Sequence, residues 1–191
     1  MTNLPTGLFP ALPAADPRWA LPDTPARGEG ESRVARAWAV LGGVPDPEVP
    51  ALSVVDLGLV REVTEDGDGL AVVVTPTYSG CPATEQINDA ITRALEDDGL
   101  GPVSVTLRRA PAWTTDWISE AGRARLRAYG IAPPGRCSSE GTPIRILARG
   151  VDCPRCGSAQ TERISAFGST ACKAMYRCLA CHEPFEHFKP I

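Results

Sequence analysis

Two pairs of cysteines near the end of the chain carry the clearest chemistry in the sequence. Cys153 and Cys156 form one C-x-x-C pair, Cys178 and Cys181 form a second, and 21 residues separate the pairs. Two residues between cysteines let the backbone turn tightly enough for both sulfurs to bind one ion, and four thiolates complete the tetrahedral shell that zinc prefers. Gly157, directly after the first pair, can adopt the positive φ that such a turn needs. We therefore predict a structural zinc site.

Disulfides and a redox C-x-x-C motif are the alternatives to a metal site. Disulfides belong to exported chains, and the N-terminus lacks the basic start and apolar segment of an export signal. A thioredoxin-like motif has one pair on a βαβ unit, whereas these two pairs lie among short predicted strands. Four cysteines leave no open coordination position, so we expect His182 and His187 to be bystanders rather than ligands.

A further candidate thiol is Cys81, between Gly80 and Pro82. Pro82 suits the first position of a helix, where its missing N–H costs nothing, so the sequence predicts Cys81 as the helix N-cap. Unpaired N–H groups and the helix dipole stabilise a thiolate at such a position. We interpret Cys81 as a functional thiol that meets a metal or a partner; a small buried capping residue is the alternative. Hydroxyl groups of the preceding loop are expected beside it: Thr75, Thr77 and Ser79.

Two acidic residues add to the candidate site. Asp56 lies between apolar residues, where a buried carboxylate needs hydrogen bonds or a cation, and a turn or capping role is the simpler interpretation. Glu48 lies in a proline-rich loop. Both either supply oxygen ligands or fix loops. For Trp113 and Trp117, a place in the core is favoured over a contact surface.

Hydrophobic periodicity predicts an α+β protein built from a small mixed α/β domain and a ribbon. The α/β domain has a three-stranded sheet with flanking helices, and Asp66-Gly67-Asp68-Gly69 between two β-branched runs indicates a hairpin. The expected strands are 59–64, 70–75 and 103–107, and the expected helices are 34–41, one from Pro82 to before Gly99, and one ending at Tyr129-Gly130. The ribbon strands are expected at 161–167 and 174–178, with Phe185 and Phe188 in a final extended piece.

Changes in composition divide the chain into four predicted segments. They are a disordered or loosely packed arm (1–30), the α/β domain (31–130), a linker (131–150) and the zinc ribbon (151–191). The ribbon has so few large apolar side chains that zinc binding, worth on the order of 10 kcal/mol, is expected to hold it folded.

Charge and hydropathy exclude several classes of function. The chain has a net charge of −4; residues 31–130 carry 15 acidic and 9 basic side chains, and the ribbon has little positive charge for phosphates. We therefore expect no nucleic-acid partner, although a small basic patch is left open. The longest apolar run, residues 70–74, is far too short to cross a membrane, so we expect a cytoplasmic protein with reduced thiols. Cys137, in the predicted linker, is interpreted as an incidental thiol.

With these motifs in view, the chain resembles the D subunit family of the bacterial phenylacetyl-CoA monooxygenase (epoxidase) system. Residues 31–130 resemble the α/β domain of iron–sulfur assembly factors, and the ribbon motifs complete the likeness over about three quarters of the chain. The matching motifs are Asp46-Pro47-Glu48, Asp56-Leu57-Gly58-Leu59-Val60, Thr75-Pro76-Thr77, Ser79-Gly80-Cys81-Pro82, Trp113 with Trp117, Cys153-Pro154 with Cys156, the stretch from Phe167 to Ala174, Tyr176-Arg177-Cys178 and Glu183-Pro184-Phe185.

The resemblance implies an accessory role in phenylacetate breakdown, in which the protein helps to assemble or repair the iron–sulfur cluster of the reductase component. It implies other epoxidase subunits as partners, with a homodimer left open, and iron or a cluster as transient cargo beside structural zinc. It also favours Cys81 as the residue that meets a cluster, iron or a client. Cys172 is a further candidate without an assigned role, with a buried free cysteine as the alternative.

Three functions compete at this level. The first is the maturation factor, and the second is a non-catalytic component that docks within the oxygenase complex through its ribbon. The third is an independent enzyme or thiol oxidoreductase, which is disfavoured because the sequence shows no Ser/His/Asp group, phosphate loop or paired carboxylates. We therefore expect an accessory subunit and not an enzyme.

Overall fold

The computed structural model describes residues 32–78, 80, 82–135 and 151–191. The predictions for the N-terminal arm and for Ser79, Cys81 and Cys137 lie outside these residues. Within the described part, no helix is both long and apolar enough to span a membrane.

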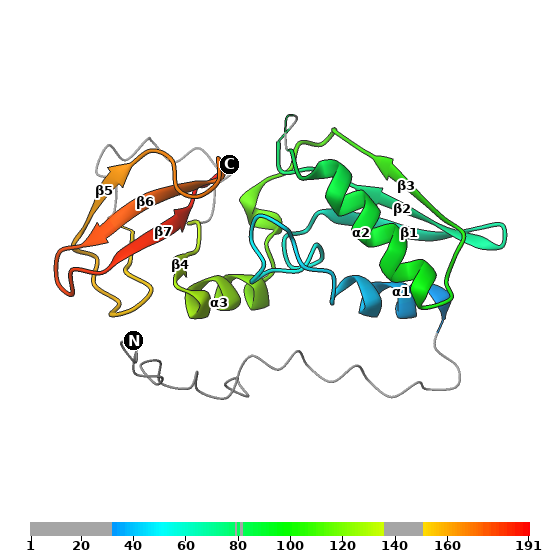
Figure 1. Ribbon diagram of the computed structural model, residues 1–191, viewed down its shortest axis with the longest axis horizontal. Coiled ribbons are helices and arrows are strands. Elements are labelled where there is room, and N and C mark those ends of the chain that lie inside the picture. Colours follow the sequence, from blue (N-terminus) through cyan, green and yellow to red (C-terminus); the bar gives the residue numbers. More distant parts are fainter. Residues whose placement is uncertain (1–31, 79, 81, 136–150) are drawn as a thin grey trace, which may run out of the picture. The chain divides into compact units, whose positions relative to one another are not determined.

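A three-stranded sheet forms the centre of the α/β domain (Figure 1). β1 (Val60–Asp66) and β2 (Gly69–Val74) form an antiparallel hairpin, and β3 (Val103–Leu107) pairs with β2 in parallel, giving the order β1-β2-β3. The β-branched residues of these strands suit a pleated, half-buried surface, and β2 is the most buried of the three. The predicted hairpin and third strand are confirmed.

Two helices cover this sheet. α1 (Arg33–Leu41) begins where the Ser32 hydroxyl accepts a hydrogen bond from the N–H of Ala35, at 3.1 Å. α2 (Thr84–Asp97) provides the crossover that a parallel strand pair requires, and Figure 1 shows it lying across the strands. The buried residues of α2 recur at helical spacing and pack towards the sheet: Ile87, Ile91 and Leu95. The predicted helix is thus confirmed apart from its start.

The start of α2 differs from the prediction. Pro82 lies in a turn ahead of the helix, and Ala83 is the N-cap, with no side-chain cap bond. The placement of Cys81 as N-cap is therefore wrong, because the regular helical hydrogen bonding begins only at Thr84. Pro fits the irregular turn before a helix as well as its first position, so the proline signal alone does not distinguish the two.

A third helix leads from the α/β domain to the ribbon. A 3-10 turn, η2 (Thr115–Trp117), precedes α3 (Glu120–Tyr129), which ends at Gly130 with a φ of 93°. Glycine adopts this left-handed conformation without a steric penalty, which confirms the predicted glycine stop. β4 (Ile131–Ala132) follows directly.

The C-terminal part forms a second sheet of order β4-β7-β6-β5. β5 (Thr161–Ser165), β6 (Lys173–Cys178) and β7 (Pro184–Phe188) are antiparallel neighbours, as the ribbon prediction expects. β4 joins the sheet by pairing in parallel with β7. Residues 131 and 132 therefore belong to the ribbon sheet, whereas the sequence predicts a linker from residue 131.

Part of the ribbon packs into the hydrophobic core of the α/β domain, while Ala132, Cys153, Cys178 and Phe185 form a second buried cluster within the ribbon. Residues 31–191 form one compact unit, and Cys172 and Phe188 of the ribbon belong to the same buried cluster as the sheet and helices. The Phe188 ring lies 6.2 Å from the ring of Trp113, whose indole N–H donates to the carbonyl of Leu57 at 2.9 Å. Trp113 is thus a core residue, as expected. Trp117 is half-buried beneath the guanidinium of Arg61.

Candidate functional site

Two tight turns bring the four ribbon cysteines together. In the first, the N–H of Gly157 donates to the carbonyl of Cys153 at 2.9 Å, and Gly157 has a φ of 76°. In the second, the N–H of Cys181 points to the sulfur of Cys178 at 3.4 Å, and His182 has a φ of 64°. The two turns are alike, since each places a residue of positive φ directly after its second cysteine. The glycine signal is visible in the sequence, but the equivalent role of His182 is not.

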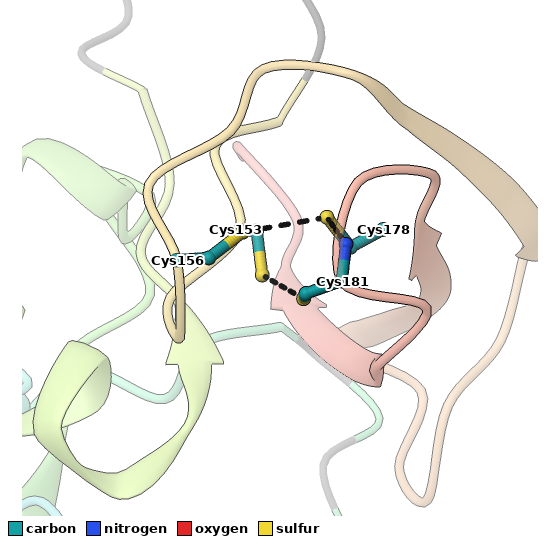
Figure 2. A group of neighbouring side chains, drawn as sticks. All are labelled: Cys153, Cys156, Cys178 and Cys181. Atoms are coloured by element: carbon teal, nitrogen blue, oxygen red, sulfur yellow. Dashed lines mark hydrogen bonds between the residues drawn. The ribbon is translucent and has the colours of Figure 1, made fainter.

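The geometry of the four sulfurs fits a single metal ion. Sγ of Cys153 lies 3.8 Å from Sγ of Cys181, Sγ of Cys156 lies 3.6 Å from Sγ of Cys178, and all four lie within 4.8 Å of one another. A tetrahedral zinc ion with Zn–S bonds of about 2.3 Å requires S–S edges of about 3.8 Å. Figure 2 shows the four side chains converging from the two turns. The predicted ligand set is therefore gathered as a metal site requires.

The pKa of Cys178 suits metal binding, whereas the pKa values of Cys156 and Cys181 are raised. The N–H groups of Cys181 and Ala180 lower this pKa to about 6, even though burial acts in the opposite direction. Metals bind the thiolate, so this sulfur is available in its binding form at neutral pH.

A second group of polar side chains lies where the ribbon meets the α/β domain. The carboxylate of Asp46 accepts hydrogen bonds from the N–H groups of Glu48 at 2.9 Å and Val49 at 2.8 Å. These bonds close a local turn that fixes the loop ahead of the sheet. Oδ1 of Asp46 thus holds the loop, and the loop in turn positions Glu48.

The ribbon reaches this loop through the first residues of β6 and the turn before them. Sγ of Cys172 lies 4.0 Å from Oε2 of Glu48 and 3.0 Å from Oγ1 of Thr170. The Lys173 ammonium donates to the carbonyl of Glu48 at 3.4 Å and pairs with the carboxylate of Glu186 at 2.9 Å. Lys173 is buried, and its hydrogen bond to Glu48 links the ribbon to the loop, whereas the ion pair with Glu186 lies within the ribbon.

A small pocket opens at this place, and we call it the junction pocket. Its polar lining residues are Asp46, Glu48, Thr77, Thr84 and Cys172, and Pro76 also lines it. Apolar side chains complete it: Val49, Leu57, Leu59, Val74, Ile87 and Phe188. Its volume of about 20 Å³ is enough for one water molecule. Burial in this apolar setting raises the pKa of Cys172 above its ordinary value, and burial and the neighbouring Asp46 raise that of Glu48.

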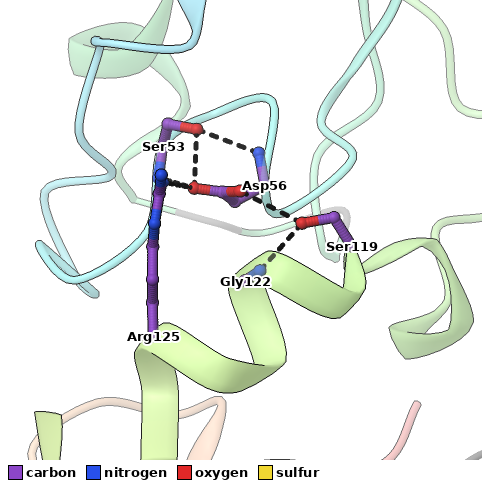
Figure 3. Close-up of polar contacts among 5 residues, drawn as sticks. All are labelled: Ser53, Asp56, Ser119, Gly122 and Arg125. Carbon is purple, nitrogen blue, oxygen red and sulfur yellow. Dashed lines mark hydrogen bonds and ion pairs between the residues drawn. The ribbon is translucent and has the colours of Figure 1, made fainter. Parts of the chain in front are cut away.

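Asp56 lies apart from the junction pocket, in a network of its own (Figure 3). Its carboxylate accepts hydrogen bonds from the backbone N–H and the hydroxyl of Ser53, at 3.2 and 3.0 Å, and from the hydroxyl of Ser119 at 3.0 Å. Arg125 forms an ion pair with the same carboxylate. Ser119 also caps α3 by accepting the N–H of Gly122 at 2.8 Å. Asp56 therefore ties its turn to the start of α3.

The structure thus divides the predicted site residues. It places Glu48 and Thr77 in one pocket with Cys172, and it buries Thr75, whose N–H donates to Leu59 at 2.8 Å, at the end of β2. Ser79 and Cys81 lie outside the described residues. The sequence reasoning missed Lys173 as a neighbour of this pocket, because only tertiary packing brings it to the loop.

Comparisons with known proteins identify the two parts. The PaaD zinc beta ribbon domain matches residues 136–189, and the iron–sulfur cluster assembly protein family matches residues 35–107. A protein of Escherichia coli (strain K12), provisionally named as the D subunit of 1,2-phenylacetyl-CoA epoxidase, is 52% identical over 159 residues. The match covers 83% of this chain and 94% of that protein. The chain belongs to this epoxidase D-subunit family.

The α/β domain of the chain also matches shorter proteins. YitW of Bacillus subtilis (strain 168) is 36% identical over 85 residues, covering 44% of this chain and 82% of that protein. SufT of Staphylococcus aureus (strain USA300) is 35% identical over 83 residues, covering 42% of this chain and 93% of that protein. Both are named Fe–S protein maturation auxiliary factors. The chain therefore joins a domain of the maturation-factor type to a zinc ribbon.

Proposed function

We propose that this protein is an accessory maturation subunit of a phenylacetyl-CoA epoxidase system in aerobic phenylacetate breakdown. Its task is to assist assembly or repair of the iron–sulfur cluster in the reductase component, in the cytoplasm, without an active site of its own. One observation carries the proposal: a chain of the epoxidase D-subunit family contains a domain matched by iron–sulfur maturation factors. The reductase is the client, and iron or a cluster is the cargo.

Two groups of residues divide the work in this proposal. The four ribbon cysteines hold a structural zinc ion, because their sulfurs already lie at tetrahedral distances and leave no position for a substrate. Cys81 is the functional thiol that meets the cargo or the client, with Ser79 beside it in the sequence. Glu48 and Thr77 line the junction pocket, and the buried Thr75 holds the end of β2. The proposed segments are 1–30, 31–130, 131–150 and 151–191, with residues 131 and 132 of the third segment joining the ribbon sheet.

Co-expression with the reductase component tests the proposal. Cys81→Ala should lower the iron and acid-labile sulfide content of the purified reductase several-fold, while the zinc content of the variant chain stays at the wild-type level. Cys137→Ala is the matched control, since it removes one thiol from the predicted linker and should leave the reductase unchanged. Full cluster occupancy with Cys81→Ala, or in cells that lack this chain, would contradict a maturation role.

A docking role without chemistry is the second candidate, and the ribbon surface favours it. Ile164, Phe167 and Leu179 are exposed apolar side chains, and Phe167 is 65% exposed. Contiguous exposed apolar patches mark contact surfaces, and the docking role requires that these side chains act together as one. In this case the protein would co-elute with the oxygenase subunits on size-exclusion chromatography, Phe167→Ser would weaken the complex, and Cys81→Ala would have no effect on reductase cluster content.

A further inference from the structure

The hairpin of β6 and β7 connects the four-thiol centre to the α/β domain. Its turn carries two of the four metal-site sulfurs, those of Cys178 and Cys181. Its open end is formed by the antiparallel pair of Lys173 and Phe188, and both of these side chains are buried. The hairpin is therefore held by the metal site at its turn and by the α/β domain at its open end.

Two contacts join the open end to separate segments of the α/β domain. The Lys173 ammonium donates to the carbonyl of Glu48, at 3.4 Å, in the loop ahead of the sheet. The Phe188 ring packs on Trp113, with the ring centroids 6.2 Å apart, in the segment that leads to α3. A loosened hairpin would therefore withdraw support from both segments at once.

The position of the Lys173 ammonium depends on both strands of the hairpin. Lys173 lies on β6, and its ammonium pairs at 2.9 Å with the carboxylate of Glu186 on β7. This ion pair crosses the hairpin and holds the ammonium where it meets Glu48. The hydrogen bond to the loop therefore requires a hairpin whose two strands stay in register.

The order of the hairpin depends in turn on the metal site. The buried cluster within the ribbon consists of Ala132, Cys153, Cys178 and Phe185, so two of its four members are metal-site cysteines. A sheet with so small an apolar core depends on metal binding for its stability. Loss of the ion should therefore loosen the turn and the two strands that extend from it.

We propose that metal binding at the four-thiol centre controls the loop of residues 46–49 in the α/β domain, through the β6–β7 hairpin and Lys173. With zinc bound, the hairpin stays in register and the loop is fixed through Glu48; without zinc, both are loosened. Because coupling between two sites is reciprocal, the contact of Lys173 with Glu48 also strengthens zinc binding. The coupling is a property of the chain itself and is independent of the client that the chain serves.

Hydrogen–deuterium exchange of the full-length chain, with zinc bound and after its removal under anaerobic conditions, measures the coupling. The reporters are the N–H groups of Glu48 and Val49, which donate to the Asp46 carboxylate at 2.9 and 2.8 Å. In wild type these protons should exchange about 10-fold or more faster without zinc, within the usual range of coupling between sites. The amides of β1 and β2 are the internal control and should keep their zinc-loaded rates.

Substitution of Lys173 separates the coupling from a general loss of stability. Lys173→Met keeps a long side chain at this buried position but removes the donor to Glu48. Its loop amides should exchange about as fast with zinc as without it, while one zinc ion per chain stays bound and a competing chelator removes that zinc several-fold more readily. Arg177→Met is the matched control, because Arg177 lies on the same strand and pairs with Glu162 inside the ribbon. Its loop amides should respond to zinc as those of wild type do.

Equal loop exchange with and without zinc in wild type would overturn the proposal, as would a zinc effect of full size in Lys173→Met. If the zinc-free chain unfolds as a whole, exchange at β1 and β2 shows it, and a wild-type loop rate in zinc-loaded Lys173→Met then contradicts the coupling. Glu186→Gln, which releases the ammonium from its partner across the hairpin, should also speed loop exchange and keeps the test decisive if Lys173→Met does not fold. Reductase cluster content plays no part in these readouts, so the maturation role can fail while the coupling stands.

Discussion

The four-thiol centre of the ribbon and the junction pocket both contain cysteine sulfur, but the two sites are built differently. The centre has four sulfurs within 4.8 Å of one another, supplied by two local turns. The pocket has one thiol, from Cys172 of the ribbon, which points to the carboxylate of Glu48 of the α/β domain at 4.0 Å. Four thiolates gathered in this way suit a structural metal ion that stabilises the fold, whereas the thiol and the carboxylate of the pocket meet only through the packing of the ribbon on the α/β domain. The two sites therefore differ in whether local turns or tertiary contacts bring their residues together.

The largest effect is expected from opening the complete centre. Cys178→Ser removes one of four thiolates, and the ribbon loses a metal contribution on the order of 10 kcal/mol, which its small core does not replace. Zinc content should fall to background, and the amide signals of β5 to β7 should lose dispersion in NMR spectra. Cys137→Ser is the control, with full zinc expected. A folded, zinc-loaded Cys178→Ser ribbon would show that the four sulfurs do not hold the domain.

An intermediate effect is expected from loosening the joint between the two regions. Phe188 is 1% exposed and packs against Trp113, so Phe188→Ala should lower the free energy of unfolding by about 3–5 kcal/mol. The four-thiol centre lies outside this contact, so zinc should stay bound. Urea unfolding and the zinc content measure the two outcomes.

Phe167→Ala is the matched control for this joint. Its ring is exposed and lies beneath the ammonium of Lys189, a contact worth at most about 1 kcal/mol. Equal losses from the two substitutions would mean that the ribbon and the α/β domain do not share a core.

Local signals in the sequence were enough to predict the closed centre. Spacing within each C-x-x-C pair and Gly157 identified it, because both turns are short-range structures. The hairpin from β1 to β2 was predictable for the same reason, since its turn residues and alternating runs are adjacent. The start of α2 was misplaced, because a proline before a helix is compatible with more than one register.

Non-local packing decides what the sequence could not predict. β4 pairs with β7, which lies more than 50 residues away in the sequence. A strand of two residues is too short to show a periodic pattern. Cys172 was a candidate without a role, because it meets Glu48 only where the ribbon packs on the α/β domain, as Phe188 does on Trp113. The four-thiol centre can thus be predicted from the spacing of the cysteines, whereas the junction pocket can be found only from the tertiary structure.

The smallest expected effect is the change of stability with pH that comes from His187, on β7 of the ribbon. His187 is buried beside the ring of Tyr176, and burial lowers its pKa below the ordinary value of 6.5. The unfolded chain therefore binds this proton at a higher pH than the folded chain does. Below about pH 6.5 the unfolded state carries more protons, so the free energy of unfolding falls as pH decreases towards the folded pKa. Well above about pH 6.5, the contribution of His187 to the free energy of unfolding no longer changes with pH.

Substituting the two histidines shows whether this contribution belongs to the buried ring. His187→Gln should flatten the change in urea midpoint between about pH 7.5 and 5.5, with zinc content checked at each pH. His182→Asn, which tolerates the left-handed backbone at that exposed position, should keep the wild-type slope. If the slope survives His187→Gln, the pH response does not come from the buried ring on β7.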